Sequence, residues 1–265
     1  MKRIRYLIFI VLFACLTACY VISEDDLFED YEPKIVVEAQ ISNIDKYYYV
    51  SIAKTANPND SISQYPFSDA RVIVSDNQGN SELLSLVAPG IYTGNEIMAT
   101  PNTEYSLLVQ IDDTEYTAVD VMQMSAVVSK TEIKYIDKFV PEEGNYIKLY
   151  IQKEKNRTSY YKLEITKNDS LFNGYNDMII FEDTYAVETF EYLIPYAFQY
   201  NDSVIIDLHK ISSEMYKYYF ELSKQTNNTF RYIQAPMQNP PTNINNNALG
   251  YFQVSAITRL NILIE

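Results

Sequence analysis

Tryptophan is absent from this chain of 265 residues, histidine occurs once, and glycine occurs only six times. The six glycines are isolated from one another, so the chain has no glycine-rich loop that could cradle a phosphate. A catalytic zinc site usually takes two or three imidazole or thiolate ligands, which this composition does not offer. No Gly-x-Ser-x-Gly motif accompanies His209, so the elbow of a serine hydrolase is missing. We therefore expect no cofactor, no metal site and no enzymatic activity.

Cysteine is scarce as well, and both cysteines lie in one short apolar segment near the N-terminus. Three basic residues precede this segment, and its apolar stretch runs from Tyr6 to Leu16. Because a transmembrane helix takes about 20 residues, this stretch is too short to cross a bilayer. Small residues follow it, as signal peptidases require. The pattern predicts a signal peptide over residues 1–18.

The last residues of that segment, Leu16-Thr17-Ala18-Cys19, resemble the lipobox of bacterial lipoproteins. The resemblance implies cleavage between Ala18 and Cys19 and attachment of lipid to Cys19. Two or three acyl chains then hold the protein stably in a membrane, whereas one chain would not. The alternatives are an ordinary signal peptide with an incidental cysteine, or an uncleaved anchor. A mature chain of this kind has no second cysteine for a disulfide, so its stability must come from burial.

Charge changes when residues 1–18 are removed. They carry three basic and no acidic side chains, so the net charge goes from −14 to −17. Such a charge argues against nucleic-acid binding and against electrostatic docking on anionic lipid. Residues 19–33 form an acidic tether that contains Ser23-Glu24-Asp25-Asp26. This tether is either a solvated linker or, by resemblance, the acidic export tag of Bacteroidota surface lipoproteins. We expect an outer-membrane protein on the periplasmic or the cell-surface face, with the surface favoured.

Short strand-like segments separated by turn residues follow the tether. Asn43, Asp76 to Asn80, and Asp112-Asp113 mark three of these turns. The spacing predicts an Ig-like β-sandwich domain over residues 34–124. The expected strands include 34–42, 47–53, 70–74, 82–87, 104–111 and 115–122.

The remaining chain, residues 125–265, is expected to form a second β-rich domain. Its strand candidates are 131–139, 146–152, 160–166, 178–181, 204–208, 250–256 and 260–264. Apolar residues from Ile211 to Leu222 recur at helical spacing, which predicts one amphipathic helix near 212–225. Ser212 or Ser213 can cap this helix, and Glu214 suits its first turn. The predicted fold class is therefore mainly β.

Several segments resemble known families. Residues 69–74, 89–92 and 100–107 resemble an Ig-like or carboxypeptidase-regulatory-like module. Residues 240–244 and 247–252 resemble the ending of a Bacteroidota lipoprotein family of unknown function, whose members are often encoded beside TonB-dependent transporters. This resemblance implies a protein that is accessory to such a transporter. The family has no established catalytic residues, so it assigns none here.

Other residues that could carry chemistry have plainer explanations. The acidic pairs Asp112-Asp113, Glu142-Glu143 and Glu182-Asp183 suggest a glycosidase. However, neighbours on a strand point to opposite faces, so turns and surfaces account for them better. Asp76 to Asn80 resembles a calcium loop, yet Val87 stands where an EF-hand needs glutamate, which favours a hairpin. His209 is expected to be a structural side chain.

Tyrosine is abundant, with 25 residues, and several occur in clusters such as Tyr47-Tyr48-Tyr49. On a strand, successive rings face opposite sides, so we expect about half of them to be exposed. An exposed aromatic patch would mark a partner site.

Three Asp-Ser-apolar motifs resemble the O-glycosylation sequon of Bacteroidota. Their serines are Ser61, Ser170 and Ser203. Each motif also fits a plain turn that leads into a strand.

Three functions fit the sequence. The preferred one is a non-enzymatic lipoprotein that binds a partner or ligand, with Cys19 in the membrane and a TonB-dependent transporter as the expected partner. The second is a structural or adhesive surface protein. The third, a polymer-degrading hydrolase, requires two carboxylates that converge in one cleft.

Overall fold

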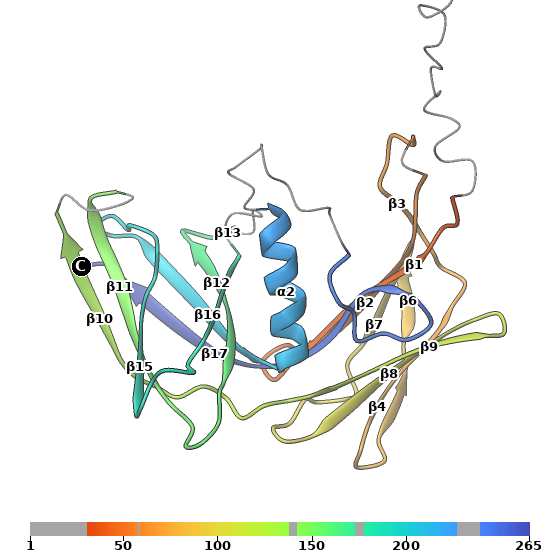
Figure 1. The fold of residues 1–265 in the computed structure, drawn as a ribbon, viewed down its shortest axis with the longest axis horizontal. Coiled ribbons are helices and arrows are strands. Elements are labelled where there is room, and N and C mark those ends of the chain that lie inside the picture. The colour runs from red at the N-terminus through yellow and green to blue at the C-terminus, as the bar shows by residue number, and fades with distance from the viewer. Residues whose placement is uncertain (1–30, 58, 138–141, 173–177, 227–238) are drawn as a thin grey trace, which may run out of the picture. The chain divides into compact units, whose positions relative to one another are not determined.

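The structure is a computed structural model that describes residues 31–57, 59–137, 142–172, 178–226 and 239–265 (Figure 1). It has two compact units. In the first, Thr55–Tyr65 join Tyr31–Pro33, and the Tyr31 hydroxyl donates a hydrogen bond to the Thr55 hydroxyl. The second unit contains Lys34–Lys54 and Pro66–Glu265 and holds two large hydrophobic cores and a smaller cluster under the helix.

The first core lies in a β-sandwich at the N-terminal end of the second unit. One layer has the strand order β17-β1-β2-β7-β6, and the other has the order β5-β4-β8-β9. In β8, Tyr105, Leu107, Val109 and Ile111 alternate with more exposed residues and enter the core. The strands are β1 Ile35–Ser42, β2 Tyr48–Thr55, β4 Arg71–Asp76, β5 Ser81–Leu83, β6 Ser85–Ala88, β7 Ile91–Gly94, β8 Glu104–Ile111, β9 Thr114–Val121 and β17 Leu249–Leu263, while β3 is Gln64–Pro66.

The second core lies between the continuation of the first layer and a separate sheet. The first layer continues from β17 as β16-β12-β13, with β14 also paired to β12, and the facing sheet has the order β10-β11-β15. Side chains from β11, β12 and β16 fill the space between them, among them Leu149, Leu163 and Leu208. The strands are β10 Val128–Ile136, β11 Gly144–Gln152, β12 Tyr160–Lys167, β13 Ser170–Phe172, β14 Ile179–Glu182, β15 Thr189–Leu193 and β16 Ser203–Ile211.

Strand β17 belongs to both sandwiches. Its residues 249–255 pair in parallel with β1, and its residues 256–263 pair antiparallel with β16. Phe252 and Val254 therefore enter the first core, whereas Leu260 and Ile262 pack on the second. The expected strands 250–256 and 260–264 are thus one strand of 15 residues.

The domain boundary expected at residue 124 separates β9 from β10, but it does not separate the cores. Ile244 and Ala248, from the segment expected in the second domain, are buried in the first core. The Asn243 side chain fixes this segment, because its amide donates to Phe252 O at 2.7 Å and its oxygen accepts from Phe252 N–H at 3.0 Å.

The amphipathic helix is α2, Ser213–Thr226, one residue from the predicted range. Ser212 is the N-cap, since its hydroxyl accepts a hydrogen bond from Met215 N–H at 3.3 Å. Met215, Tyr218 and Tyr219 face the sheet, and the helix packs on β12, β14 and β17. The predicted class is confirmed: the fold is mainly β, with β-sandwiches and, among the described residues, one helix of this kind.

Candidate functional site

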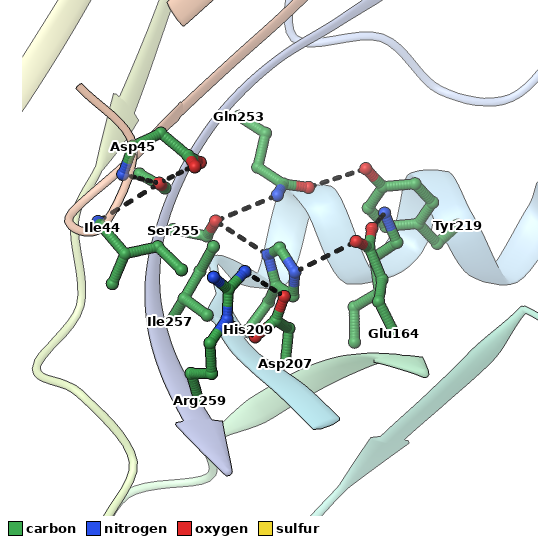
Figure 2. A network of polar contacts seen from close by, with 12 residues as sticks. Ile44, Asp45, Glu164, Asp207, His209, Tyr219, Gln253, Ser255, Ile257 and Arg259 are labelled. Atoms are coloured by element: carbon green, nitrogen blue, oxygen red, sulfur yellow. Dashed lines mark hydrogen bonds and ion pairs between the residues drawn. The ribbon is translucent and has the colours of Figure 1, made fainter. Parts of the chain in front are cut away.

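The single histidine lies on β16, beneath α2, and is buried. Its Nδ1 lies 3.1 Å from the hydroxyl of Ser255, and its Nε2 lies 3.5 Å from the carboxylate of Glu164 (Figure 2). Register explains the grouping. Lys162 of β12 pairs with His209, and His209 pairs with Ile257 of β17, so outward-facing residues of three strands meet under the helix.

These contacts close into a ring of six side chains. The Tyr219 hydroxyl donates to Gln253 Oε1 at 2.7 Å, and Gln253 Nε2 donates to Ser255 at 3.2 Å (Figure 2). On the other side, Lys162 donates to Glu164 at 2.7 Å and lies 4.7 Å from the centre of the Tyr219 ring. The ring joins α2 to strands β12, β16 and β17.

The order Ser255, His209, Glu164 invites comparison with a catalytic triad. The contact with His209 is the main cause of a strongly lowered pKa of Glu164, so this acid is ionised at neutral pH. However, the Ser255 side chain is fully buried and also accepts a hydrogen bond from Gln253. A substrate cannot reach that hydroxyl in this conformation, and the ring of contacts holds α2 on the sheet.

A different place in the same unit is hollow. A cleft of about 600 Å³ lies where β9, the loop 156–159, the end of β16 and the start of α2 meet. Its lining carries both signs of charge, from Asp120, Arg157, Lys210 and Glu214. Sequence reasoning singled out only Glu214 of these four, because their convergence depends on contacts between segments far apart in the chain.

Asp120 is the most unusual group in this cleft. Its carboxylate accepts hydrogen bonds from Val254 N–H at 2.7 Å and from Val121 N–H at 3.0 Å. The pKa of Asp120 is raised to about 6, mainly by burial and to a smaller extent by the charge of Glu214, while the hydrogen bonds from Val254, Ser212 and Val121 act in the opposite direction. A carboxyl with a pKa near physiological pH inside a cleft is a candidate functional group.

The wall of the cleft is held by two ion pairs. Lys210 is almost fully buried and forms a short contact with Glu154. Lys153 lies 2.9 Å from the fully buried Asp183, which also accepts a hydrogen bond from Ser159 N–H at 2.8 Å. Both pairs fix the loop between β11 and β12.

The three serines proposed for glycosylation are all exposed and stand far apart in the chain. Ser61 lies in a turn of the first unit, and Ser170 and Ser203 begin β13 and β16. The neighbouring Asp60 and Asp202 are engaged in their own turns, where they accept hydrogen bonds from Asn57 N–H at 3.0 Å and Gln199 N–H at 2.7 Å. Glycosylation of these serines stays a prediction.

The other acidic residues considered as catalytic or calcium-binding candidates lie in turns or in buried positions. Asp112 sits in the β8–β9 hairpin with a positive φ, and Asp183 is fully buried beside Lys153. Asp76 closes its hairpin by accepting hydrogen bonds from the N–H groups of Gln78 and Asn80, both at 2.9 Å. No cluster of three metal-ligating residues occurs among the described residues.

Ala18 and Cys19, together with the whole expected signal peptide and most of the acidic tether, lie outside the described residues. Within the part of the chain that the structure describes, no helix has the length and apolar character needed to span a membrane.

Two solved structures resemble the fold: two fibronectin type-III domains of chicken tenascin and the adhesin InvE of Yersinia pseudotuberculosis. The first is 9% identical, covers 68% of this chain and 91% of its own, and has a TM-score of 0.22. The second is 11% identical, covers 87% of this chain, and has a TM-score of 0.23; the present chain spans 58% of its length. None of the curated proteins matches the chain.

The family comparison is decisive. A family model described as a domain of unknown function, DUF4249, matches residues 22–261, which include the first core, nearly all of the second core, α2 and the cleft. The family resemblance seen in the sequence is thus confirmed at this level, and the chain belongs to the DUF4249 family.

Proposed function

We propose that this protein is a lipid-anchored, non-enzymatic binding protein of the bacterial outer membrane. In this proposal Cys19 carries the lipid, the acidic tether spans residues 19–33, and the folded body faces the cell surface of a member of the Bacteroidota. The partner is a TonB-dependent transporter.

The anchor rests on the sequence around Cys19. A basic start, a short apolar stretch and Leu16-Thr17-Ala18-Cys19 give the order that lipoprotein processing requires. The mature body would carry a charge of −17 and would be repelled by anionic lipid. A covalent anchor holds such a body at a membrane that its own surface does not bind.

One observation supports a binding function over a catalytic one: exposed apolar side chains lie near a polar cleft. Val119 lines the cleft and Met124 follows its wall residue Gln123, and each is about half exposed. Tyr185 is 96% exposed, and its neighbour Thr184 contacts Thr158 of the cleft wall. Apolar anchors around a polar recess are typical of a protein-binding surface.

The anchor is tested by labelling cells with radioactive palmitate. We expect the natural chain to incorporate label and to fractionate with the outer membrane. Cys19→Ala should lose the label, whereas Cys15→Ala should keep it. A soluble, unlabelled natural chain would contradict the proposal. Digestion of intact cells with protease then tests the surface location.

The partner is tested by co-purification from detergent-solubilised membranes. We expect a TonB-dependent transporter to be recovered with the protein, in near-equal amounts. Recovery of a lone protein would refute the transporter role and favour the structural or adhesive alternative, for which contact with other cells is the expected property.

One observation favours a second function, a hydrolase: Asp120 and Glu214 line the same cleft. A raised pKa suits the carboxyl of Asp120 to a general acid, and a retaining or inverting glycosidase needs a second carboxyl group in the same cleft. Against this, both oxygens of Asp120 already accept backbone hydrogen bonds. Hydrolysis of surface polysaccharides by the purified protein that disappears in both Asp120→Asn and Glu214→Gln would establish this second function instead.

A further inference from the structure

Asp120 is a buried charge without a cationic partner. Its relative exposure is 5%, and the ion pairs of the described residues do not include it. Its hydrogen bonds come from neutral groups: two backbone N–H groups and the Ser212 hydroxyl. A carboxylate in such surroundings gains from any cation that enters the cleft.

The cations that already line the cleft are engaged elsewhere. Lys210 contacts Glu154, and Arg157 donates a hydrogen bond to Gln123 at 2.6 Å. Glu214 adds a second negative charge, and it is exposed at the start of α2. When Glu154, the partner of Lys210, is included, the acidic side chains around this cleft are Asp120, Glu154 and Glu214, and the basic ones are Arg157 and Lys210. The acids therefore outnumber the bases by one.

A second, independent observation points to a polar ligand in the same place. Ser159 lines the cleft and is 97% buried, and its hydroxyl makes no hydrogen bond of normal geometry to the described residues, although the Tyr161 hydroxyl lies beside it. A ligand donor or acceptor would give this buried hydroxyl a well-formed hydrogen bond.

The exposed neighbours of the cleft suit a polypeptide rather than a small ion. Val119 lines the cleft and is half exposed, and the exposed Met124 and Tyr185 directly follow residues that line the cleft or contact its wall. A volume of about 600 Å³ is in the range of pockets that enclose a sizeable organic group.

We propose that the cleft receives a basic side chain, lysine or arginine, from an extended segment of a partner protein, with Asp120 as its counter-ion. The overall charge of −14 favours such a cationic partner. This inference rests on the proposed function, since it names the chemistry by which the binding protein recognises its partner.

The experiment uses the full-length protein in detergent and two labelled peptides, acetylated tri-lysine and acetylated tri-glutamate, at low ionic strength and pH 7.5. Three forms are compared: the natural chain, Asp120→Asn and Asp112→Asn. The last is a matched control, because it removes the same charge from an exposed hairpin residue whose positive φ asparagine tolerates well.

We expect the natural chain and Asp112→Asn to bind tri-lysine with affinities within twofold of each other, and Asp120→Asn to bind at least tenfold more weakly. Tri-glutamate should bind none of them. Equal binding by all three forms would mean that only overall charge is sensed, and no binding of tri-lysine, or preferential binding of tri-glutamate, would equally overturn the inference.

The two proposals fail in distinguishable ways. If Asp120→Asn recovers its partner from membranes as well as the natural chain does, the cleft is not the recognition site, although the proposed function stands. If the natural chain recovers no transporter, the transporter role fails, and the peptide measurement still decides what the cleft binds.

Discussion

At the scale of single residues, Asp120 makes the stability of the protein depend on pH. Its pKa is raised from 3.8 to about 6 in the folded state, so the folded state binds the proton more tightly than the unfolded state does. Stability from this group is therefore present at low pH and is lost as pH rises through about 4 to 6. The shift corresponds to about 3 kcal/mol.

Asp120→Asn removes this titration. We compare the unfolding free energies of the variant and the natural chain by urea denaturation. As the pH rises from 3.5 to 7.5, their difference should move by about 3 kcal/mol in favour of the variant. Asp112→Asn, which removes the carboxylate of an exposed hairpin residue, is measured alongside as the control for the loss of one negative charge. A constant difference for Asp120→Asn would show that its carboxyl titrates normally.

Position 250 is a second place where the backbone requires a particular residue, glycine. Its φ is +93°, and a Cβ placed there would lie 2.0 Å from Val37 O on the paired strand β1. Gly79 has a similar φ of +97° but open space around it. We expect Gly250→Ala to destabilise the protein by at least about 3 kcal/mol, and Gly79→Ala by about 1 kcal/mol, in thermal or urea unfolding. Equal losses would mean that the approach to Val37 is not limiting.

Sequence reasoning did well where a residue's environment follows from its own strand. Tyr48 is buried between the half-exposed Tyr47 and Tyr49, as alternation predicts. The sequence alone could not identify Asp120 as unusual, because an acidic residue in an alternating strand segment normally faces the solvent. Val254 N–H, its partner, is 134 residues away.

At the scale of elements, α2 is held on the sheet by the polar ring around His209. Tyr219→Phe removes the hydroxyl that donates to Gln253 and leaves a fully buried amide oxygen without its donor. We expect a loss of about 1–3 kcal/mol in unfolding free energy. The control, Tyr200→Phe, changes a ring that is 70% exposed and should alter stability by less than about 0.5 kcal/mol. A loss of equal size in both variants would indicate that the polar ring around His209 does not hold α2 on the sheet.

The elements themselves were largely predictable from local patterns. Strand β8 has the predicted bounds, and α2 begins one residue after the predicted start because Ser212 serves as its cap. The short strands β3, β13 and β15 were missed, and two of them have only three residues. A segment that short carries no period that distinguishes it from a turn.

At the scale of the whole molecule, two hydrophobic cores share one strand. Because β17 contributes side chains to both, loss of either core removes the strand from the other. We expect a single calorimetric unfolding transition. Leu107→Ala and Leu163→Ala, one in each core, should each lower that transition, with a loss of about 2–5 kcal/mol.

A thermogram that splits into two transitions in either variant would contradict this coupling. The sequence did not predict that the two cores are coupled through one strand, because the pattern of residues 249–263 is that of two separate strands. That pattern also does not indicate that β17 pairs with β1. Register across more than 200 residues is decided by packing, and a single sequence does not reveal it.

The shared strand also sets the timing of folding. Strand β17 follows β1 by more than 200 residues, although the two strands are neighbours in the sheet. The parallel pairing of β1 with β17 can therefore form only after all the strands between them have been synthesised, so β1 waits for its partner while the rest of the chain emerges.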